Sequence, residues 1–190
     1  MGSAPVWNPA DYQEPLVLVC LGAGVARAGQ IWQPLPQRNV RLAMVTTAPR
    51  TGRGPEPGLA RRVASAAAGR PYALLGHREA AATLLGVLPL LDTKPAPSRL
   101  IAVAAVPPAG HTPGQVPISA VCSARDPVAP PAVMAGWRKL SAASFSLQVL
   151  GDGPDPLVSE PVRLLESIQH DLRIPPASVP GRGLAWVAGS

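Results

Sequence analysis

The chain has 190 residues, of which 47% are hydrophobic and 15% are charged, so it is long enough and apolar enough to fold around a single core. Its formal net charge is +6, yet the Arg residues are scattered along the chain, with Arg61–Arg62 as the only adjacent pair. Because nucleic-acid-binding proteins gather positive charge on one face or arm, this scatter argues against nucleic acid and is compatible with an acidic protein partner.

The sequence also predicts a protein without a membrane span. No apolar run reaches the ~18 residues that a membrane helix needs, and residues 1–14 lack the basic and apolar regions of a signal peptide. Cys20 and Cys122 each end a short apolar run, which predicts two buried thiols in a reducing compartment. We therefore expect a cytoplasmic protein.

Hydrophobic patterning divides the chain into an irregular arm (1–14), a single domain (15–173) and a tail rich in Pro and Gly (174–190). Within the domain, apolar runs predict strands at Leu16–Leu21, Val40–Val45, Tyr72–Leu75, Leu100–Val106, Val116–Cys122 and Phe145–Leu150. The remaining pattern predicts a loop at Pro49–Gly58 and helices at Leu59–Ala68, Glu79–Leu88, Pro130–Leu140 and Ser159–Leu172, the last with Ser159 as its N-cap. Because strands alternate with helices, we expect an α/β fold with a mostly parallel sheet and helices on both faces.

Motifs for cofactor binding are incomplete or absent. Gly22-Ala-Gly24 follows a predicted strand, as the dinucleotide-binding motif does, but Arg27 replaces the third glycine and no acidic residue follows at the required distance. No Gly-Lys-Ser/Thr sequence forms a phosphate-binding loop, and neither cysteine has the spacing of a metal ligand. We expect no cofactor and no metal.

The most informative stretch covers residues 70–80, where a strand leads through a Gly76-His77 turn directly into a helix. In α/β-hydrolases such a turn is the nucleophile elbow, Gly-x-Ser-x-Gly. The stretch resembles the elbow of type II thioesterases from polyketide and nonribosomal peptide pathways, which carry Arg-Pro-Tyr, a short strand and then Gly-His-Ser-Met-Gly. Arg78, Glu79 and Ala80 stand here at the positions of the serine, the methionine and the last glycine.

Other segments extend the resemblance in both directions. Gly22, Ala23 and Gly24, with Trp32 behind them, resemble the family's Ala-Gly-Gly turn and the tryptophan that follows it. The resemblance implies that this turn and His77 border the substrate and the oxyanion hole. Further matches occur at Arg50, Glu56-Pro57 and Trp137-Arg138.

The C-terminal half carries the rest of the catalytic pattern. Residues 125–130 resemble the loop of the catalytic aspartate, which would be Asp126. Residues 149–154 match the stretch that ends in the catalytic histidine, and Pro154 stands in its place. The family's helical lid falls between the strands at Leu100–Val106 and Val116–Cys122, where this chain has only about nine residues. The fold that the resemblance implies is an α/β-hydrolase without its lid.

These substitutions remove the chemistry of acyl hydrolysis. A serine hydrolase needs a nucleophile, a base and a group that orients the base, and only Asp126 remains. Arginine stays protonated, so Arg78 cannot replace the serine or the base. We consider two roles for Arg78: an anion receptor at a helix N-terminus, or a side chain that fills the vacated site and pairs with Asp126. Glu79 is an alternative base, whereas structural roles are expected for His77, His111 and His170.

The resemblance implies a non-hydrolytic thioesterase-like protein of a polyketide or nonribosomal peptide pathway. Its partner would be an acyl or peptidyl carrier protein, a synthase or a tethered intermediate. One alternative is a repurposed enzyme, such as a cyclase, lyase or dehydratase, with Arg78, Glu79 and Asp126 as its site. Another alternative is a structural subunit that pairs with an active enzyme. The oligomeric state stays open.

Overall fold

A computed structural model describes residues 16–32, 40–45 and 57–172 of the chain. The predicted arm and tail, and the matches at Arg50 and Glu56, lie outside these ranges. No helix within the described ranges is long and apolar enough to cross a membrane. The strands in these ranges are β1 (Leu16–Leu21), β2 (Val40–Val45), β3 (Tyr72–His77), β4 (Leu100–Val103), β5 (Ile118–Cys122) and β6 (Phe145–Val149).

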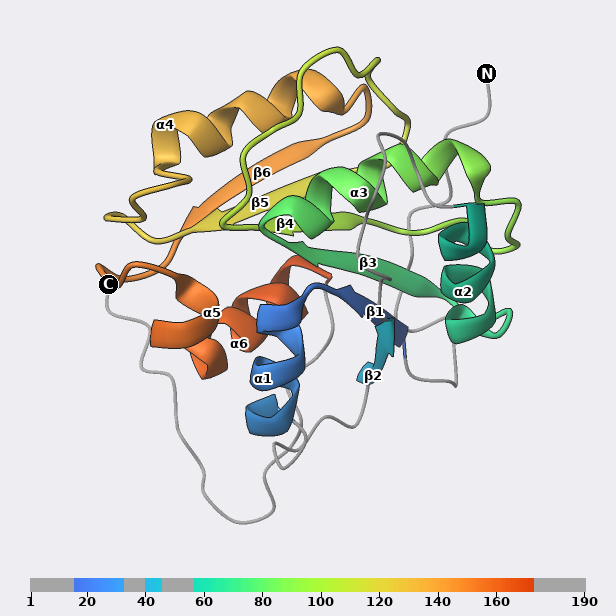
Figure 1. The fold of residues 1–190 in the computed structure, drawn as a ribbon, viewed down its shortest axis with the longest axis horizontal. Helices are drawn as coiled ribbons and strands as arrows, with labels where there is room; N and C mark the ends of the chain where they lie inside the picture. The colour runs from blue at the N-terminus through green and yellow to red at the C-terminus, as the bar shows by residue number, and fades with distance from the viewer. Residues whose placement is uncertain (1–15, 33–39, 46–56, 173–190) are drawn as a thin grey trace, which may run out of the picture.

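The six strands form one sheet in the order β2-β1-β3-β4-β5-β6, and every neighbouring pair is parallel (Figure 1). The predicted parallel sheet of an α/β fold is therefore confirmed. From β1 the chain passes first to β2 on one side and later to β3 on the other side. In open parallel sheets, such a switch leaves a crevice at the carboxyl ends of the two strands, and ligands bind there.

Helices cover both faces of the sheet (Figure 1). One layer contains α1 (Ala23–Trp32), α5 (Pro156–Ser159) and α6 (Pro161–Asp171). The other contains α2 (Pro57–Ala67), α3 (Glu79–Val87), the 3-10 helix η2 (Leu88–Leu90), α4 (Pro131–Met134) and the 3-10 helix η3 (Ala135–Leu140), which continues α4. β1 supplies alternate residues to the two cores because successive side chains of a strand point to opposite faces, and all six of its residues are buried.

Helix α1 differs from the sequence-based expectation. The pattern predicts only a turn at Gly22–Gly24, whereas a helix begins directly after β1. Glycine lowers helix propensity, so the two glycines of this segment weaken its helical signal. The buried side of α1 is formed by Val25, Ala28 and Trp32, and the Trp32 indole N–H donates to the carbonyl of Pro161 at 2.7 Å.

The predicted helix Ser159–Leu172 is wrong at its beginning. Two helices meet there, because α5 ends at Ser159 and α6 begins at Pro161. Proline lacks the N–H that would continue α5 and fits the first position of a helix, so the chain breaks between them. The side-chain N-cap is Asp155 rather than Ser159, since the Asp155 carboxylate accepts the N–H of Leu157.

Other boundaries shift by a few residues. β4 ends at Val103 rather than at Val106, so the segment that joins it to β5 is longer than predicted. The predicted helix Pro130–Leu140 is a single α-helical turn followed by η3. Pro57 and Gly58, which belong to a predicted loop, form the beginning of α2.

Candidate functional site

The turn between β3 and α3 has the geometry of a nucleophile elbow. Arg78 at its apex has φ 57° and ψ −130°, a conformation that is strained for any residue except glycine. Its N–H donates to the carbonyl of Val103 at 3.0 Å, and its carbonyl accepts the N–H of Ala81 at 3.1 Å. A side chain at Gly76 would overlap the backbone of Ala81, so this glycine lets α3 fold back onto β3. The elbow is present, and an arginine occupies its apex.

The turn after β1 packs against the elbow. Gly22 has φ +118°, and a Cβ there would lie 3.2 Å from the carbonyl oxygen of His77. A Cβ at Gly24 would collide with the His77 imidazole. The structure thus brings Gly22, Gly24 and His77, three of the four predicted substrate-binding residues, together at the switch point between β1 and β3. The fourth, Ala23, is the first residue of α1.

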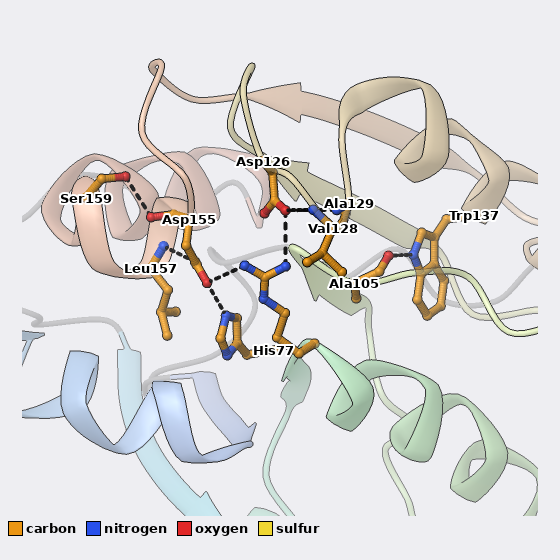
Figure 2. Close-up of polar contacts among 10 residues, drawn as sticks. His77, Ala105, Asp126, Val128, Ala129, Trp137, Asp155, Leu157 and Ser159 are labelled. Atoms are coloured by element: carbon orange, nitrogen blue, oxygen red, sulfur yellow. Dashed lines mark hydrogen bonds and ion pairs between the residues drawn. The ribbon is translucent and has the colours of Figure 1, made fainter.

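Arg78 forms two ion pairs that join three loops at the carboxyl edge of the sheet. Its Nη1 donates to Asp126 Oδ1 at 3.1 Å, in the loop after β5, and its Nη2 donates to Asp155 Oδ2 at 3.0 Å, after β6. The His77 Nε2 also bonds to Asp155 Oδ2, at 2.7 Å. Figure 2 shows His77, Asp126 and Asp155 converging from separate segments. Of the two roles considered for Arg78, the structure contains the pairing with Asp126.

Asp126 is only 2% exposed, and one of its two carboxylate oxygens accepts all the hydrogen bonds that the described residues donate to it. Oδ1 accepts the N–H groups of Val128 and Ala129, both at 2.8 Å, in addition to the guanidinium of Arg78. Oδ2 is buried and has no hydrogen-bond partner among the described residues. This unpartnered oxygen is consistent with the absence of the histidine that the resemblance places at position 154.

Asp155 is the site residue that the sequence analysis missed. It follows Pro154, which occupies the expected histidine position and is itself exposed. Besides Arg78 and His77, the Asp155 carboxylate bonds the N–H of Leu157 at 3.0 Å and so caps α5. An Asp followed by Pro is typical of a helix beginning, with Asp at the N-cap and Pro at the first helical position, and this signal indicates the cap.

The cluster contains one guanidinium, that of Arg78, and two carboxyl groups, those of Asp126 and Asp155. Burial acts to raise the pKa of the Asp155 carboxyl, but the hydrogen bond and charge of His77, the N–H of Leu157 and the charge of Arg78 outweigh burial and hold this pKa below its usual range. Both Asp126 and Asp155 therefore compete with any incoming anion for Arg78. This geometry does not support the role of anion receptor.

The remaining predicted candidates lie outside the cluster. Glu79 is exposed at the beginning of α3, and no hydrogen bond or ion pair in the described part of the chain joins its carboxylate to Arg78 or Asp126. His111 and His170 are exposed, in the segment after β4 and on α6. Glu79 is therefore poorly placed to act as the base of this site.

Neither cysteine supplies a replacement nucleophile. Cys20 and Cys122 are free and buried, as predicted. Burial raises the pKa of Cys20 to about 12, and burial together with the negative charge of Asp126 raises the pKa of Cys122 to about 11. Because the thiolate is the nucleophilic form, both thiols stay protonated and unreactive near neutral pH.

Residues 104–117 join β4 to β5 at the place where the resemblance expects the helical lid, and they contain no helix. The segment is fixed along η3 at two points. The Trp137 indole N–H donates to the carbonyl of Ala105 at 2.7 Å, and a Cβ at Gly136 would approach Pro107 to 2.9 Å. The connection is therefore an anchored loop on the same layer as α4.

The ion pairs of Arg78 connect the loops at this edge, and among the described residues they leave no nucleophile or base at the elbow. The elbow carries a permanently protonated guanidinium, which is neither a nucleophile nor a base. The His77 imidazole is bonded to Asp155 through Nε2, and its Nδ1 side packs against Gly24, so it is not placed to activate a nucleophile. Within the described residues, the site keeps an orienting aspartate without the nucleophile and base that hydrolysis needs.

No protein-family profile and no curated protein matches the sequence. Solved structures do match. RedJ, a thioesterase from the prodiginine biosynthetic pathway in Streptomyces coelicolor, aligns with a TM-score of 0.66 and 21% identity over 90% of this chain and 96% of its own. YbtT, a type II thioesterase from the yersiniabactin NRPS/PKS pathway, aligns with a TM-score of 0.66 and 14% identity over 89% and 97%. XC6422 from Xanthomonas campestris, an α/β serine hydrolase without a lid, aligns with a TM-score of 0.58 and 18% identity over 86% and 84%.

Each of these matches covers more than four fifths of this chain. Because the identities are low, they establish the architecture rather than the chemistry. The lidless neighbour shows that this architecture does not require a lid. The chain therefore has the α/β-hydrolase fold of the type II thioesterases.

Proposed function

We propose that the protein is a non-hydrolytic component of a polyketide or nonribosomal peptide pathway that uses a thioesterase fold to bind a carrier protein or its tethered intermediate. The observation that carries this proposal is Arg78 at the apex of the elbow, paired with both Asp126 and Asp155. A guanidinium cannot attack a thioester, and the described residues give Asp126 no histidine to orient. The ion pairs keep Arg78 at the position where a nucleophile would be needed to form an acyl-enzyme.

The turn after β1 and the segment between β4 and β5 support the binding of a ligand at this edge of the sheet. Gly22 and Gly24 keep the turn after β1 in contact with the elbow, at the switch point where parallel sheets bind ligands. Residues 104–117, at the place where the resemblance expects the lid, contain no helix. A site without a helical lid would suit a group that is presented by another protein better than it would suit the enclosure of a free small molecule.

The repurposed-enzyme alternative has less support. It requires Glu79 to act together with Arg78 and Asp126, and Glu79 is exposed and outside their network. The alternative of a structural subunit predicts a stable complex with an active enzyme of the same pathway. Size-exclusion chromatography of the mixed proteins distinguishes that complex from a monomer.

We expect the purified protein to leave acyl thioesters intact. With an acyl-N-acetylcysteamine thioester or an acylated carrier protein, thiol release should stay at the uncatalysed rate, because no described nucleophile and base meet at the elbow. A serine thioesterase run in parallel should be faster by a factor of at least about 10⁴. Isothermal titration calorimetry with the holo-carrier protein, which bears its phosphopantetheine arm, should show saturable binding.

Two variants make this test decisive. Thiol release above the uncatalysed rate that disappears in both Arg78→Ala and Asp126→Asn would contradict the proposal, because it would show turnover at this site. A protein that neither hydrolyses thioesters nor binds the holo-carrier would contradict the proposed partner.

A further inference from the structure

Exposed charges are separated along the described chain. Residues 93–151, which include β4, β5 and β6, contain five Lys or Arg residues and a single acid, Asp126, which is buried and paired. All other described acids lie within residues 79–92 or after residue 151. Arg99 is paired with Asp171, but no described acid pairs with the four exposed cations Lys94, Arg125, Arg138 and Lys139. Arg138 and Lys139 at the end of η3 therefore carry positive charge that no described acid pairs with, whereas Arg125 lies in a loop that neighbours Asp152, because the N–H of Ala124 donates to the carbonyl of Gly151 at 2.9 Å.

Three of these cations flank one exposed face of α4 and η3. Arg125 lies in the loop before α4, and Arg138 and Lys139 lie at the end of η3. Ala132 and Ala135 are exposed between them, whereas the opposite side is buried and consists of Met134, Trp137 and Leu140. From the rise per residue of α and 3-10 helices, this face extends over roughly 18 Å. We call it the cationic face, and it comprises Arg125, Val128, Ala132, Ala135, Arg138 and Lys139.

The composition of the cationic face favours a protein partner over nucleic acid. Val128 is 55% exposed in the loop before α4, and Ala132 and Ala135 are exposed along α4 and η3, so exposed apolar residues stand in the chain between Arg125 and Arg138, a composition typical of protein interfaces. Surfaces that bind single-stranded nucleic acid add aromatic side chains for base stacking. In the described part of the chain the aromatic residues are not exposed: Trp32, Tyr72 and Trp137 are buried, and Phe145 is half-buried.

We infer that the cationic face is the docking surface for an acidic helix of the partner protein. The inference rests on the proposed function, which names a carrier-protein domain as that partner. Opposite charges across an interface steer association and fix its orientation, and the length of the face corresponds to about 12 residues of α-helix. A helix seated there would bring its acidic side chains to Arg138 and Lys139, which no described acid pairs with.

The cationic face adjoins the elbow site. Val128 contributes its side chain to the face, and its N–H donates to Asp126 Oδ1, the same oxygen that pairs with Arg78. A partner docked on the face therefore contacts the loop that holds the ion pair. The cationic face and the elbow site therefore form one continuous binding surface in this proposal.

Charge reversal on the cationic face tests the inference. The double variant Arg138→Glu with Lys139→Glu should raise the Kd for a holo-acyl carrier protein domain by roughly tenfold or more, and Arg125→Glu should raise it by a smaller factor. A matched control, Arg41→Glu with Arg61→Glu, makes the same charge change at exposed positions of β2 and α2 (Figure 1). It should bind like the wild type. Calorimetry at about 50 and about 300 mM NaCl should show a weaker salt dependence for the first double variant than for the wild type.

The outcomes separate the docking surface from the proposed function. Normal binding by Arg138→Glu with Lys139→Glu, or equal losses in both double variants, would overturn the docking surface while the proposed function stands. Absence of binding by the wild type would overturn both. Tighter binding of the wild type to a DNA duplex of about 20 base pairs than to the carrier domain would assign the face to nucleic acid instead.

Discussion

Replacing Arg78 with Met is expected to lower the free energy of unfolding by about 3 kcal/mol, because removing one partner of a buried ion pair leaves the other charge uncompensated. Asp126 is 2% exposed and would keep only the N–H groups of Val128 and Ala129. Asp155 would lose its bond from the guanidinium. Urea denaturation followed by circular dichroism measures the change as a shift in midpoint at constant slope.

Two further variants show whether the loss comes from charge. Arg78→Lys keeps the charge but cannot reach both carboxylates with a planar fork, so an intermediate loss is expected. Adding Asp126→Asn to Arg78→Met removes the uncompensated charge and should recover part of the stability. If Arg78→Met were neutral or stabilising, as substitutions at strained catalytic positions often are, the cluster would be a functional site rather than a structural connection.

Asp155→Ala is expected to cost about 3 kcal/mol of folding stability, because it removes both a helix cap and a charge-assisted network. The carboxylate caps α5 through Leu157 and also bonds Arg78 and His77. Asp155→Asn keeps a side chain that caps helices well and removes only the charge, so it should cost less than the alanine variant. Denaturation of the two variants at neutral pH separates the cap from the charge.

The contribution of the Asp155 charge should also depend on pH. Its pKa is lowered in the folded protein, so the stabilisation is fully present above the ordinary pKa of about 3.9 and is lost as the pH falls through the lower, folded value. The difference in unfolding free energy between the wild type and Asp155→Asn should therefore shrink as the pH falls below about 4. A difference that persists undiminished into acid would show that the charge is not its source.

The sequence predicted the sheet well because its central strands are buried on both faces. Strands such as β1 read as continuous apolar runs that stop at glycine, which is the strongest pattern a parallel sheet produces. The elbow was predictable because Gly76-His77 lies between a strand and a helix. These features depend on residues that are neighbours in the chain. Local patterning is sufficient for them.

The features that were missed depend on contacts between distant segments. Helix α1 contains two glycines, and its place is fixed by packing, including the bond from Trp32 to Pro161. Asp155 carries a local signal for a helix cap, but its bond to Arg78 spans 77 residues and appears only when the loops after β3 and β6 meet. No periodic pattern in the sequence indicates that these two loops come together. The resemblance places the catalytic histidine at Pro154, whereas the side chain that lies in the site belongs to the next residue, Asp155.

The ion pairs of Arg78 also bear on how the chain folds. They connect residues 48 and 77 positions apart, so neither can form before the loops after β5 and β6 reach the elbow. Contacts of such long sequence separation form late, because the entropy of closing the intervening chain is lost first. Interactions that are absent from the folding transition state slow unfolding and leave the folding rate nearly unchanged. We therefore expect the arginine at the elbow to extend the lifetime of the folded chain without hastening its formation.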